Sequence, residues 1–309
     1  MRDDAATSGR PAAQRGRLAM IVNPAAGRHR RFARALALLS AGGVSVRLLP
    51  TGARGDAERL AAEAAAAGQV DAIIAAGGDG TINEVINGMA ASGLPLGILP
   101  LGTANVLAWE LGIGDRLADA AAVIAGRVTR RIHLGRCNGR YFVMMAGVGV
   151  DAHVVAGIRP GLKRALGRVG LGKLTYALEG LHQIARLRPR RYRVTVDGVA
   201  AEAASAIVCN GRFYAGRYVV APDANLGTPV LQACLFAGPG RLQAMRNSLA
   251  MLGHRLHRSP DLTVRRGTLI TIDGPPGDPI QADGDTIGRL PAVIDLAPTT
   301  LDVFVPRST

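Results

Sequence analysis

Cysteine and aromatic residues are scarce in this chain of 309 residues. Aromatic side chains make up 4% of it, and the three cysteines, Cys137, Cys209 and Cys234, form no CxxC pair. This spacing argues against a zinc site or a disulfide framework and favours a reducing compartment. Because hydrophobic residues still account for 48% of the chain, the sequence predicts a sizeable core built mostly from aliphatic side chains.

Long apolar runs are also missing. The apolar stretches are broken by glycine, proline or charge, well short of the ~20 residues that a membrane-spanning helix needs. Residues 1–16 contain Asp3 and Asp4 and no apolar run, so they do not resemble a secretory signal. We therefore expect a disordered tail over 1–16 and a cytoplasmic protein, with peripheral contact at the inner membrane face as an option.

Acidic residues are outnumbered, with 23 Asp and Glu against 37 Lys and Arg, a formal net charge of +14. Such an excess attracts polyanions, including nucleic acid, an anionic membrane or a nucleotide substrate. An arginine-rich surface that only keeps the protein in solution is the alternative.

Strand-like and helical segments alternate in the first part of the chain. Apolar runs predict strands at Leu18–Val22, Val44–Leu49, Val70–Ala76 and Leu96–Pro100. Helical patterns lie at about His29–Ala41, Asp56–Ala67, Thr81–Ala91, Thr103–Leu111 and Leu117–Ala125. The alternation predicts a doubly wound α/β domain over 17–130, with a parallel sheet covered on both faces.

The pattern changes after about Thr129. Short strand-like segments follow at Arg131–Arg136, Arg140–Ala146, Arg191–Val196, Ala203–Cys209, Val230–Phe236, Asp261–Arg265 and Thr268–Ile272. They predict a mostly antiparallel second domain over 131–297, interrupted by helical patterns at Leu162–Leu187 and Leu242–Leu252. Leu301–Val305 predicts a last strand.

Three glycine-containing loops follow strands of the predicted parallel sheet, at Asn23–Arg28, Gly77–Thr81 and Leu101–Asn105. Ligands of such sheets bind beyond the carboxyl ends of the strands, so these loops should converge on one crevice. Glycine allows close approach of the backbone to an anion, and the following helix N-terminus directs N–H groups at it. Together the loops predict a phosphate site, although each alone could be an ordinary turn.

Several side chains in these loops have a further expected role. Asp79 beside phosphates is explained best by an intervening Mg²⁺ ion. Thr81 and Glu84 fit a capping box as N-cap and N3. Arg28 could bind a phosphate with two hydrogen bonds, and Thr103 could either cap a helix or bind a ligand.

Gln281–Asp285 forms a second acidic cluster in the predicted second domain. A carboxylate near an acceptor hydroxyl can take its proton as the hydroxyl attacks a γ-phosphate. The Asp-Gly pair is also a strong hairpin signal, so a turn without chemistry is the alternative.

Gly157–Arg193 holds ten Lys or Arg residues, with Glu179 as its only acid. Its apolar residues recur near helical spacing, which predicts a basic amphipathic helix in contact with an anionic membrane. A core-packed helix with a solvated charged face is the alternative. Because aromatic residues are not interleaved, we expect no single-stranded nucleic-acid partner.

Five motifs carry a family resemblance: VNPAAG, TGARGDA, GGDGTINEVING, LPLGTANVLA and QADGD, at Val22–Gly27, Thr51–Ala57, Gly77–Gly88, Leu99–Ala108 and Gln281–Asp285. In this order they resemble the diacylglycerol kinase catalytic family, in its bacterial branch related to sphingosine and ceramide kinases. The resemblance implies a phosphofructokinase- or NAD-kinase-like α/β domain facing a C-terminal β-sandwich. ATP and a lipid substrate would meet between them, and a tail at about 298–309 would return to the first domain.

The resemblance also implies site residues. ATP would be held by Asn23, Gly27, Arg28, Thr51, Gly77, Gly78, Asp79, Gly80, Thr81, Ile82, Asn83, Gly102, Thr103 and Asn105. Asp79 would join a Mg²⁺ network, Asp283 matches the family's general base, and Asp285 stands where the family has glutamate.

Two stretches depart from the family pattern. Val106 replaces an aspartate of the family's GTxND motif, and Asn225–Pro229 replaces a metal-binding Asp-Asp-Gly, which leaves Asp223 as the candidate metal ligand there. The sequence thus leaves open a soluble small-molecule kinase, for NAD or a sugar, and a non-catalytic regulator. It implies no obligate protein partner, leaves a homodimer possible, and does not identify the lipid.

Overall fold

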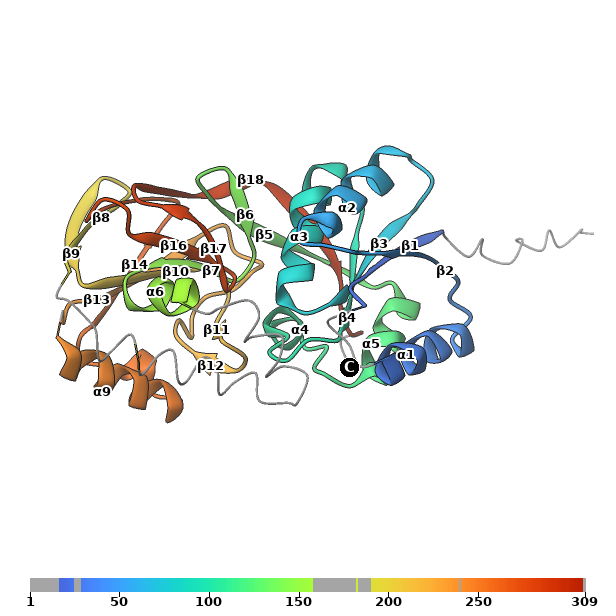
Figure 1. The fold of residues 1–309 in the computed structure, drawn as a ribbon, viewed down its shortest axis with the longest axis horizontal. Coiled ribbons are helices and arrows are strands. Elements are labelled where there is room, and N and C mark those ends of the chain that lie inside the picture. Colours follow the sequence, from blue (N-terminus) through green and yellow to red (C-terminus); the bar gives the residue numbers. More distant parts are fainter. Residues whose placement is uncertain (1–16, 25–28, 158–181, 183–189, 239, 308–309) are drawn as a thin grey trace, which may run out of the picture.

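The computed structural model describes residues 17–24, 29–157, 182, 190–238 and 240–307. The predicted tail, Gly27 and Arg28, and most of the basic segment Gly157–Arg193 lie outside these residues. Two layered units stand side by side in the described part (Figure 1).

The first unit is a parallel sheet with strand order β2-β1-β3-β4. Its strands are β1 (Leu18–Val22), β2 (Val46–Pro50), β3 (Ala72–Gly77) and β4 (Leu96–Pro100). β1, β3 and β4 are buried along their whole length, as expected of strands covered on both faces, whereas edge strand β2 is partly exposed.

Helices cover both faces of this sheet. They are α1 (His29–Ala41), α2 (Asp56–Ala66), α3 (Asp79–Met89), the short η1 (Ala90–Ser92), α4 (Val106–Glu110) and α5 (Leu117–Gly126). α2 packs with α3 on one side, and α1 packs with α5 on the other (Figure 1). The predicted doubly wound α/β fold is therefore confirmed.

The second unit is an antiparallel sandwich. One sheet has the order β14-β13-β10-β7-β16-β17 and faces β18-β15-β8-β9, with β5 and β6 beside β18. The strands are β5 (Thr129–Cys137), β6 (Arg140–Phe142), β7 (Met145–Val148), β8 (Tyr192–Val196), β9 (Val199–Ala203), β10 (Ser205–Cys209), β13 (Leu231–Phe236), β14 (Leu262–Gly267), β15 (Leu269–Asp273), β16 (Pro279–Ala282), β17 (Asp285–Arg289) and β18 (Ala292–Phe304).

An aliphatic core lies between the two sheets, with Phe142 and Tyr192 as its largest members. Helices α6 (Val150–Gly157) and α9 (Arg241–Leu252), the turn η2 (Leu256–Arg258) and a small hairpin of β11 (Phe213–Tyr214) and β12 (Tyr218–Val219) complete the unit. The predicted C-terminal sandwich is thus also confirmed.

β18 connects the two units. Its first half pairs with β15, and near its end Val303 pairs in parallel with Leu96 of β4, so one sheet runs through both units (Figure 1). Its register against β5 shifts between Leu296 and Thr300. Pro298 lies in this shift and lacks the N–H that a regular ladder needs. The strand covers the open edge of β4, which would otherwise present unpaired backbone groups.

Candidate active site

The loops after β3 and β4 lie directly against each other. A Cβ atom added to Gly102 would lie 2.5 Å from the Cα of Gly78, and one added to Gly78 would lie 3.3 Å from the Cα of Gly102. The N–H of Leu101 donates to the carbonyl of Gly77 at 2.9 Å. A side chain at position 102 would force the loops apart, and one at position 78 would fit only with a small shift of the neighbouring loop.

The ends of β1 and β2 reach the same edge of the sheet. The side-chain amide of Asn23 donates to the hydroxyl of Thr81 at 3.4 Å, and the N–H of Thr51 donates to the carbonyl of Val22 at 2.9 Å. The structure therefore brings together Asn23, Thr51 and the loops that follow β3 and β4. The helix N-termini of α3 and α4 open from these loops, which is the geometry of an anion site.

Asp79 lies in the first turn of α3 and holds the start of α4. Its carboxylate accepts hydrogen bonds from the N–H groups of Asn105 at 3.0 Å and Val106 at 2.6 Å. It thereby satisfies the N–H groups of the N-cap residue and of the first helical residue, which have no acceptor within the helix. The valine at position 106, where the family has aspartate, does not affect this contact, because the backbone N–H of the residue makes it. Thr103 is exposed, and it does not cap α4, because the N-cap position of that helix is held by Asn105.

The predicted capping box is wrong. Helix α3 begins at Asp79 with Gly78 as its N-cap. The carboxylate of Glu84 accepts instead from the N–H groups of Gly55 at 3.1 Å and Ala57 at 3.3 Å, at the start of α2. A helix N-terminus attracts a carboxylate regardless of which helix supplies it, so the local motif gave the wrong partner.

Two residues assigned to the nucleotide have other contacts. Ile82 is fully buried in the first core. Asn83 is also buried, and its amide nitrogen donates to the carbonyl of Tyr141 at 3.2 Å and to a carboxylate oxygen of Asp283 at 2.9 Å. Asn83 therefore links the two units through hydrogen bonds of its side chain.

Asp283 lies in the turn between β16 and β17. Asp283 and Gly284 both have positive φ, 48° and 83°, which fits a two-residue hairpin. Besides Asn83, its carboxylate accepts from the N–H groups of Val143 at 2.7 Å, Met144 at 2.9 Å and Met145 at 3.1 Å. Burial raises the pKa of Asp283 above its ordinary value, and these hydrogen bonds offset part of the rise.

Asp285 is the more accessible acid of the pair, with 36% of its side chain exposed. One carboxylate oxygen lies 3.5 Å from the position of a Cβ built on Gly80, and the other forms an ion pair with Arg54 at 3.6 Å. Asp285 therefore faces the loop after β3. The two acids predicted from the sequence thus come from the sandwich and meet the first unit at its glycine loops.

A buried polar network behind this hairpin had no motif in the sequence. The carboxylate of Asp151 accepts from the hydroxyl of Tyr214 and from the amide of Gln281 at 2.6 Å. The amide oxygen of Gln281 accepts from the N–H of Gly284 at 3.0 Å. Burial raises the pKa of Asp151. The network fixes the turn that carries Asp283.

Glu110 makes a second contact between the units. Its carboxylate accepts from the N–H of Arg212 at 3.0 Å, from its guanidinium at 2.9 Å, and from the N–H of Phe213 at 3.3 Å. The signal in the sequence that could have revealed it is a lone acid in the apolar run Val106–Leu111.

The described residues do not build a metal centre from protein ligands alone. No group of three His, Cys, Asp or Glu side chains gathers among them. Asp223 is exposed and pairs with Arg266 at 3.3 Å. Asn225 closes its own turn through the N–H of Gly227 and the hydroxyl of Thr228. Near the glycine loops, Asp79 and Asp285 are the carboxylates that would be available to a phosphate-bound Mg²⁺, which normally keeps several water ligands.

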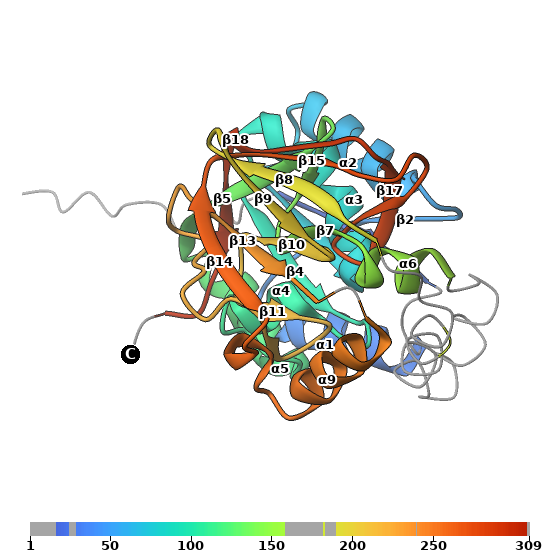
Figure 2. The ribbon, with the colours of Figure 1, turned by 90° about the vertical axis from the view of Figure 1, so that its left-hand side faces the viewer.

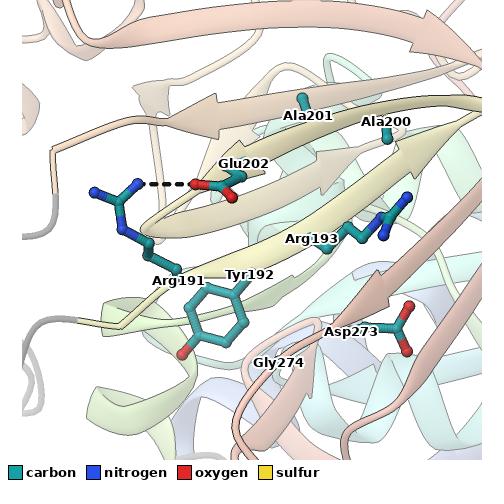
Figure 3. Close-up of a pocket in the computed structure, with 8 residues that line it drawn as sticks. All are labelled: Arg191, Tyr192, Arg193, Ala200, Ala201, Glu202, Asp273 and Gly274. Carbon is teal, nitrogen blue, oxygen red and sulfur yellow. Dashed lines mark hydrogen bonds and ion pairs between the residues drawn. The ribbon is translucent and has the colours of Figure 1, made fainter.

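A hollow of about 480 Å³ lies elsewhere, on β8, β9 and the end of β15 (Figure 3). Each charged side chain of the hollow has an oppositely charged neighbour. Arg191 pairs with Glu202 at 2.8 Å, and Arg193 lies opposite Asp273 in the strand register. It has no contact with the glycine loops, and we assign it no ligand.

Glycine loops at the strand ends of an α/β unit, faced by acids from a β-sandwich, define a two-domain kinase. The family model described as "Diacylglycerol kinase catalytic domain" matches residues 17–137. The model described as "YegS C-terminal NAD kinase beta sandwich-like domain" matches residues 145–305. The chain belongs to the bacterial diacylglycerol kinase family, as the sequence motifs predicted.

Named relatives resemble it along nearly the whole chain. The diacylglycerol kinase of Mycobacterium tuberculosis strain H37Rv is 30% identical over 94% of this chain and 96% of its own length. That of Bacillus subtilis strain 168 is 30% identical over 89% and 91%. A crystal structure of a putative diacylglycerol kinase from Bacillus anthracis strain Sterne has a TM-score of 0.77 at 26% identity, covering 94% of this chain and 98% of that one.

Proposed function

We propose that this protein is an ATP-dependent lipid kinase that transfers the γ-phosphoryl group to the hydroxyl of a diacylglycerol-like lipid. The observation that carries the proposal is the contact of Asn83 with Asp283, which joins the acidic hairpin to the helix that follows the phosphate loop. The names of the relatives support a lipid as the acceptor rather than NAD or a sugar.

The nucleotide would bind with its phosphates at Gly77–Thr81 and Gly102–Asn105. Backbone N–H groups at the start of α3 and the exposed hydroxyl of Thr103 supply donors there. Asn23 and Thr51 border the same edge. Mg²⁺, when bound with the nucleotide, neutralises phosphate charge, and Asp79 and Asp285 are its proposed protein contacts. Phosphoryl transfer depends mostly on such positioning and electrostatics.

Asp283 is proposed as the general base for the acceptor hydroxyl. Burial raises its pKa, which makes the carboxylate a better proton acceptor than an exposed one. Asp285 would orient the acceptor and the phosphate from its partly exposed position next to Gly80. ATP places this chemistry in the cytoplasm, where the lipid is reached at the inner face of the membrane.

A transfer assay with γ-labelled ATP and a panel of lipids tests the proposal. The panel should contain diacylglycerol, phosphatidylglycerol, a sphingoid base and a long-chain polyprenol, with NAD and a sugar as soluble controls. We expect label in one lipid and in neither soluble compound. Label in NAD or the sugar, or ATP binding without any transfer, would overturn the lipid-kinase assignment.

The roles of the two acids can be separated. Asp283→Asn would present amide hydrogens to the backbone donors of Val143–Met145, so its effect includes a local distortion. Asp285→Asn should disturb the fold less, because the side chain is partly exposed and its described partner is an exposed arginine, Arg54. If Asp283 is the base, D285N retains measurable transfer while D283N loses it with ATP binding retained. The reverse result would move the base role to Asp285.

A further inference from the structure

Helix α9 turns its largest apolar side chains outward. Leu242, Met245, Leu249 and Leu252 are 46–66% exposed. Their spacing of three, four and three residues places them on one side of the helix. The opposite side holds α9 to the protein, where Ala244 is buried and Met251 packs against the core. A surface helix normally shows the reverse arrangement, with its polar side in water.

The position of α9 leaves this side facing outward. In both views the helix lies at the outer edge of the sandwich (Figures 1 and 2), and Figure 1 shows β12 next to it. Its described neighbours, η2 and β12, attach through its inner side and its C-terminal end, where His254 stacks near Tyr218 with ring centroids 5.0 Å apart. No helix in the described part of the chain is long and apolar enough to cross a bilayer.

Positive charge surrounds the apolar stripe. Residues 237–260 contain no Asp or Glu and four arginines, Arg241, Arg246, Arg255 and Arg258, all exposed. Because a helix turns about 100° per residue, Arg241 and Arg246 border the stripe on its two sides. An apolar stripe flanked by cations is the pattern of a helix that lies in the interface of an anionic membrane.

Other occupants fit less well. A specific protein interface usually takes about 20 to 30 residues from each partner, whereas this stripe has four side chains on three helical turns. A second copy packed symmetrically on the stripe would bring like-charged arginines together. The arrangement thus favours a lipid surface.

We propose that α9 docks the protein on anionic phospholipid, with Leu242, Met245, Leu249 and Leu252 in the interface and the arginines at the headgroups. The choice of a membrane rests on the proposed function, since the acceptor lipid lies there. This helix is separate from the basic segment Gly157–Arg193 that the sequence predicted as the membrane contact.

Co-sedimentation of the full chain with vesicles tests the docking. Wild-type protein should bind vesicles of phosphatidylglycerol and phosphatidylcholine, and bind phosphatidylcholine alone weakly. L242D/L249D should weaken binding at least about tenfold. V199D/L269D is the matched control, because Val199 and Leu269 are 61% and 48% exposed on β9 and β15 and the charge change is the same. It should stay within about twofold of wild type.

The charge contribution has its own variant. R246Q/R255Q should lower affinity for anionic vesicles by roughly fivefold per arginine and leave binding to phosphatidylcholine unchanged. Equal vesicle binding by wild type and L242D/L249D would overturn the proposal. So would a dimer in solution that L242D/L249D dissociates, because a second copy would then cover the stripe.

Activity separates this proposal from the proposed function. L242D/L249D should phosphorylate a water-soluble short-chain diacylglycerol at the wild-type rate and lose transfer to the same lipid class in vesicles. Normal vesicle binding by the variant with intact transfer would leave the kinase assignment standing without the docking helix. Lost vesicle binding, with no transfer to any lipid by either protein, would leave the docking helix standing without the kinase assignment.

Discussion

Asn83 donates a hydrogen bond of 2.9 Å to Asp283, although the two residues are separated by 200 positions in the chain. Asn83 belongs to the helix that opens from the GGDG loop, and Asp283 to a hairpin of the sandwich. The same amide also reaches the carbonyl of Tyr141. One buried side chain therefore ties the acid hairpin directly to the helix that follows the phosphate loop.

Asn83→Ala should slow phosphoryl transfer and shift its pH dependence. A donor to the carboxylate favours its charged form, so loss of that donor raises the pKa of Asp283 further. If Asp283 must be ionised to act, the acidic limb of the kcat/KM profile moves to higher pH. We expect a loss of at least about tenfold at pH 7 and about 1–2 kcal/mol of stability. The pH–rate profile is the decisive measurement.

A purely structural role for Asn83 would give a different result. It would lower kcat/KM equally at every pH, in proportion to the loss of folded protein seen by urea unfolding. An unshifted acidic limb in N83A would therefore contradict the proposed coupling of Asn83 to the base.

The contact of Glu110 with Arg212 should respond asymmetrically to substitution. The side chain of Glu110 is 4% exposed and that of Arg212 is 45% exposed. Arg212→Gln leaves a buried carboxylate without its cation, whereas Glu110→Gln leaves a guanidinium that reaches water. We expect R212Q to cost about 2 kcal/mol and E110Q about 1 kcal/mol, values reduced from those of fully buried pairs for solvent screening. Urea unfolding of both variants measures the difference, and a larger loss in E110Q would contradict the argument.

The sequence predicts the parallel sheet, the sandwich and the glycine loops because these depend on periodicity and on local backbone demands. Gly78 and Gly102 show where this stops: the sequence predicts glycine there for close approach to an anion, and the structure adds a contact between the two loops that the sequence did not reveal. Partners far apart in the chain are not predictable in this way. Glu84 has a capping pattern for its own helix and serves α2 instead, because both sites offer free N–H groups and only the packing decides between them.

Asp151 shows the same limit for buried polar groups. Neither Tyr214 nor Gln281 has a spacing that points to Asp151, and the cluster forms only when β16, α6 and the β11–β12 hairpin are packed together. Its effect on the hairpin of Asp283 could therefore not be read from a motif, although the Asp-Gly turn itself could.

Asp151 should make the protein less stable as pH rises. Its pKa is raised by burial, so the folded state binds its proton more tightly than the unfolded state does. The stabilising contribution is complete below the unfolded pKa of ~4 and is lost as pH rises through the folded pKa. Asp151→Asn removes this titration, so the slope of unfolding free energy against pH above ~4 should become smaller. Asp283 titrates in the same direction and leaves a residual slope.

Asp56 should have the opposite effect on the pH dependence of stability, measured in the same unfolding experiment. Hydrogen bonds from the N–H groups of Gly52 and Ala53, together with Arg59, lower its pKa. Its contribution is present above the unfolded pKa of ~4 and is lost as pH falls through the folded pKa. Asp56→Asn should therefore lower the unfolding free energy by a constant amount above pH ~4, where the slope stays unaltered, and should reduce the slope below pH ~4. A change in slope above that pH would contradict the separate assignment of the two acids.

Gly102→Ala should remove nucleotide binding more than it removes stability. The new methyl group would lie 2.5 Å from the Cα of Gly78 and 2.8 Å from the side-chain oxygen of Asn105, so the two glycine loops must separate. Overpacking of this kind costs about 1–3 kcal/mol, while the separation displaces the N–H groups proposed to bind phosphate.

Gly288→Ala is the matched control, because no atom lies within 4 Å of its added Cβ and its φ is not in the left-handed region. Calorimetric titration with ATP and magnesium should show a loss of at least about tenfold in G102A and none in G288A. Equal affinity in the two variants would mean that the nucleotide does not bind at these loops, because the methyl group of G102A lies between them.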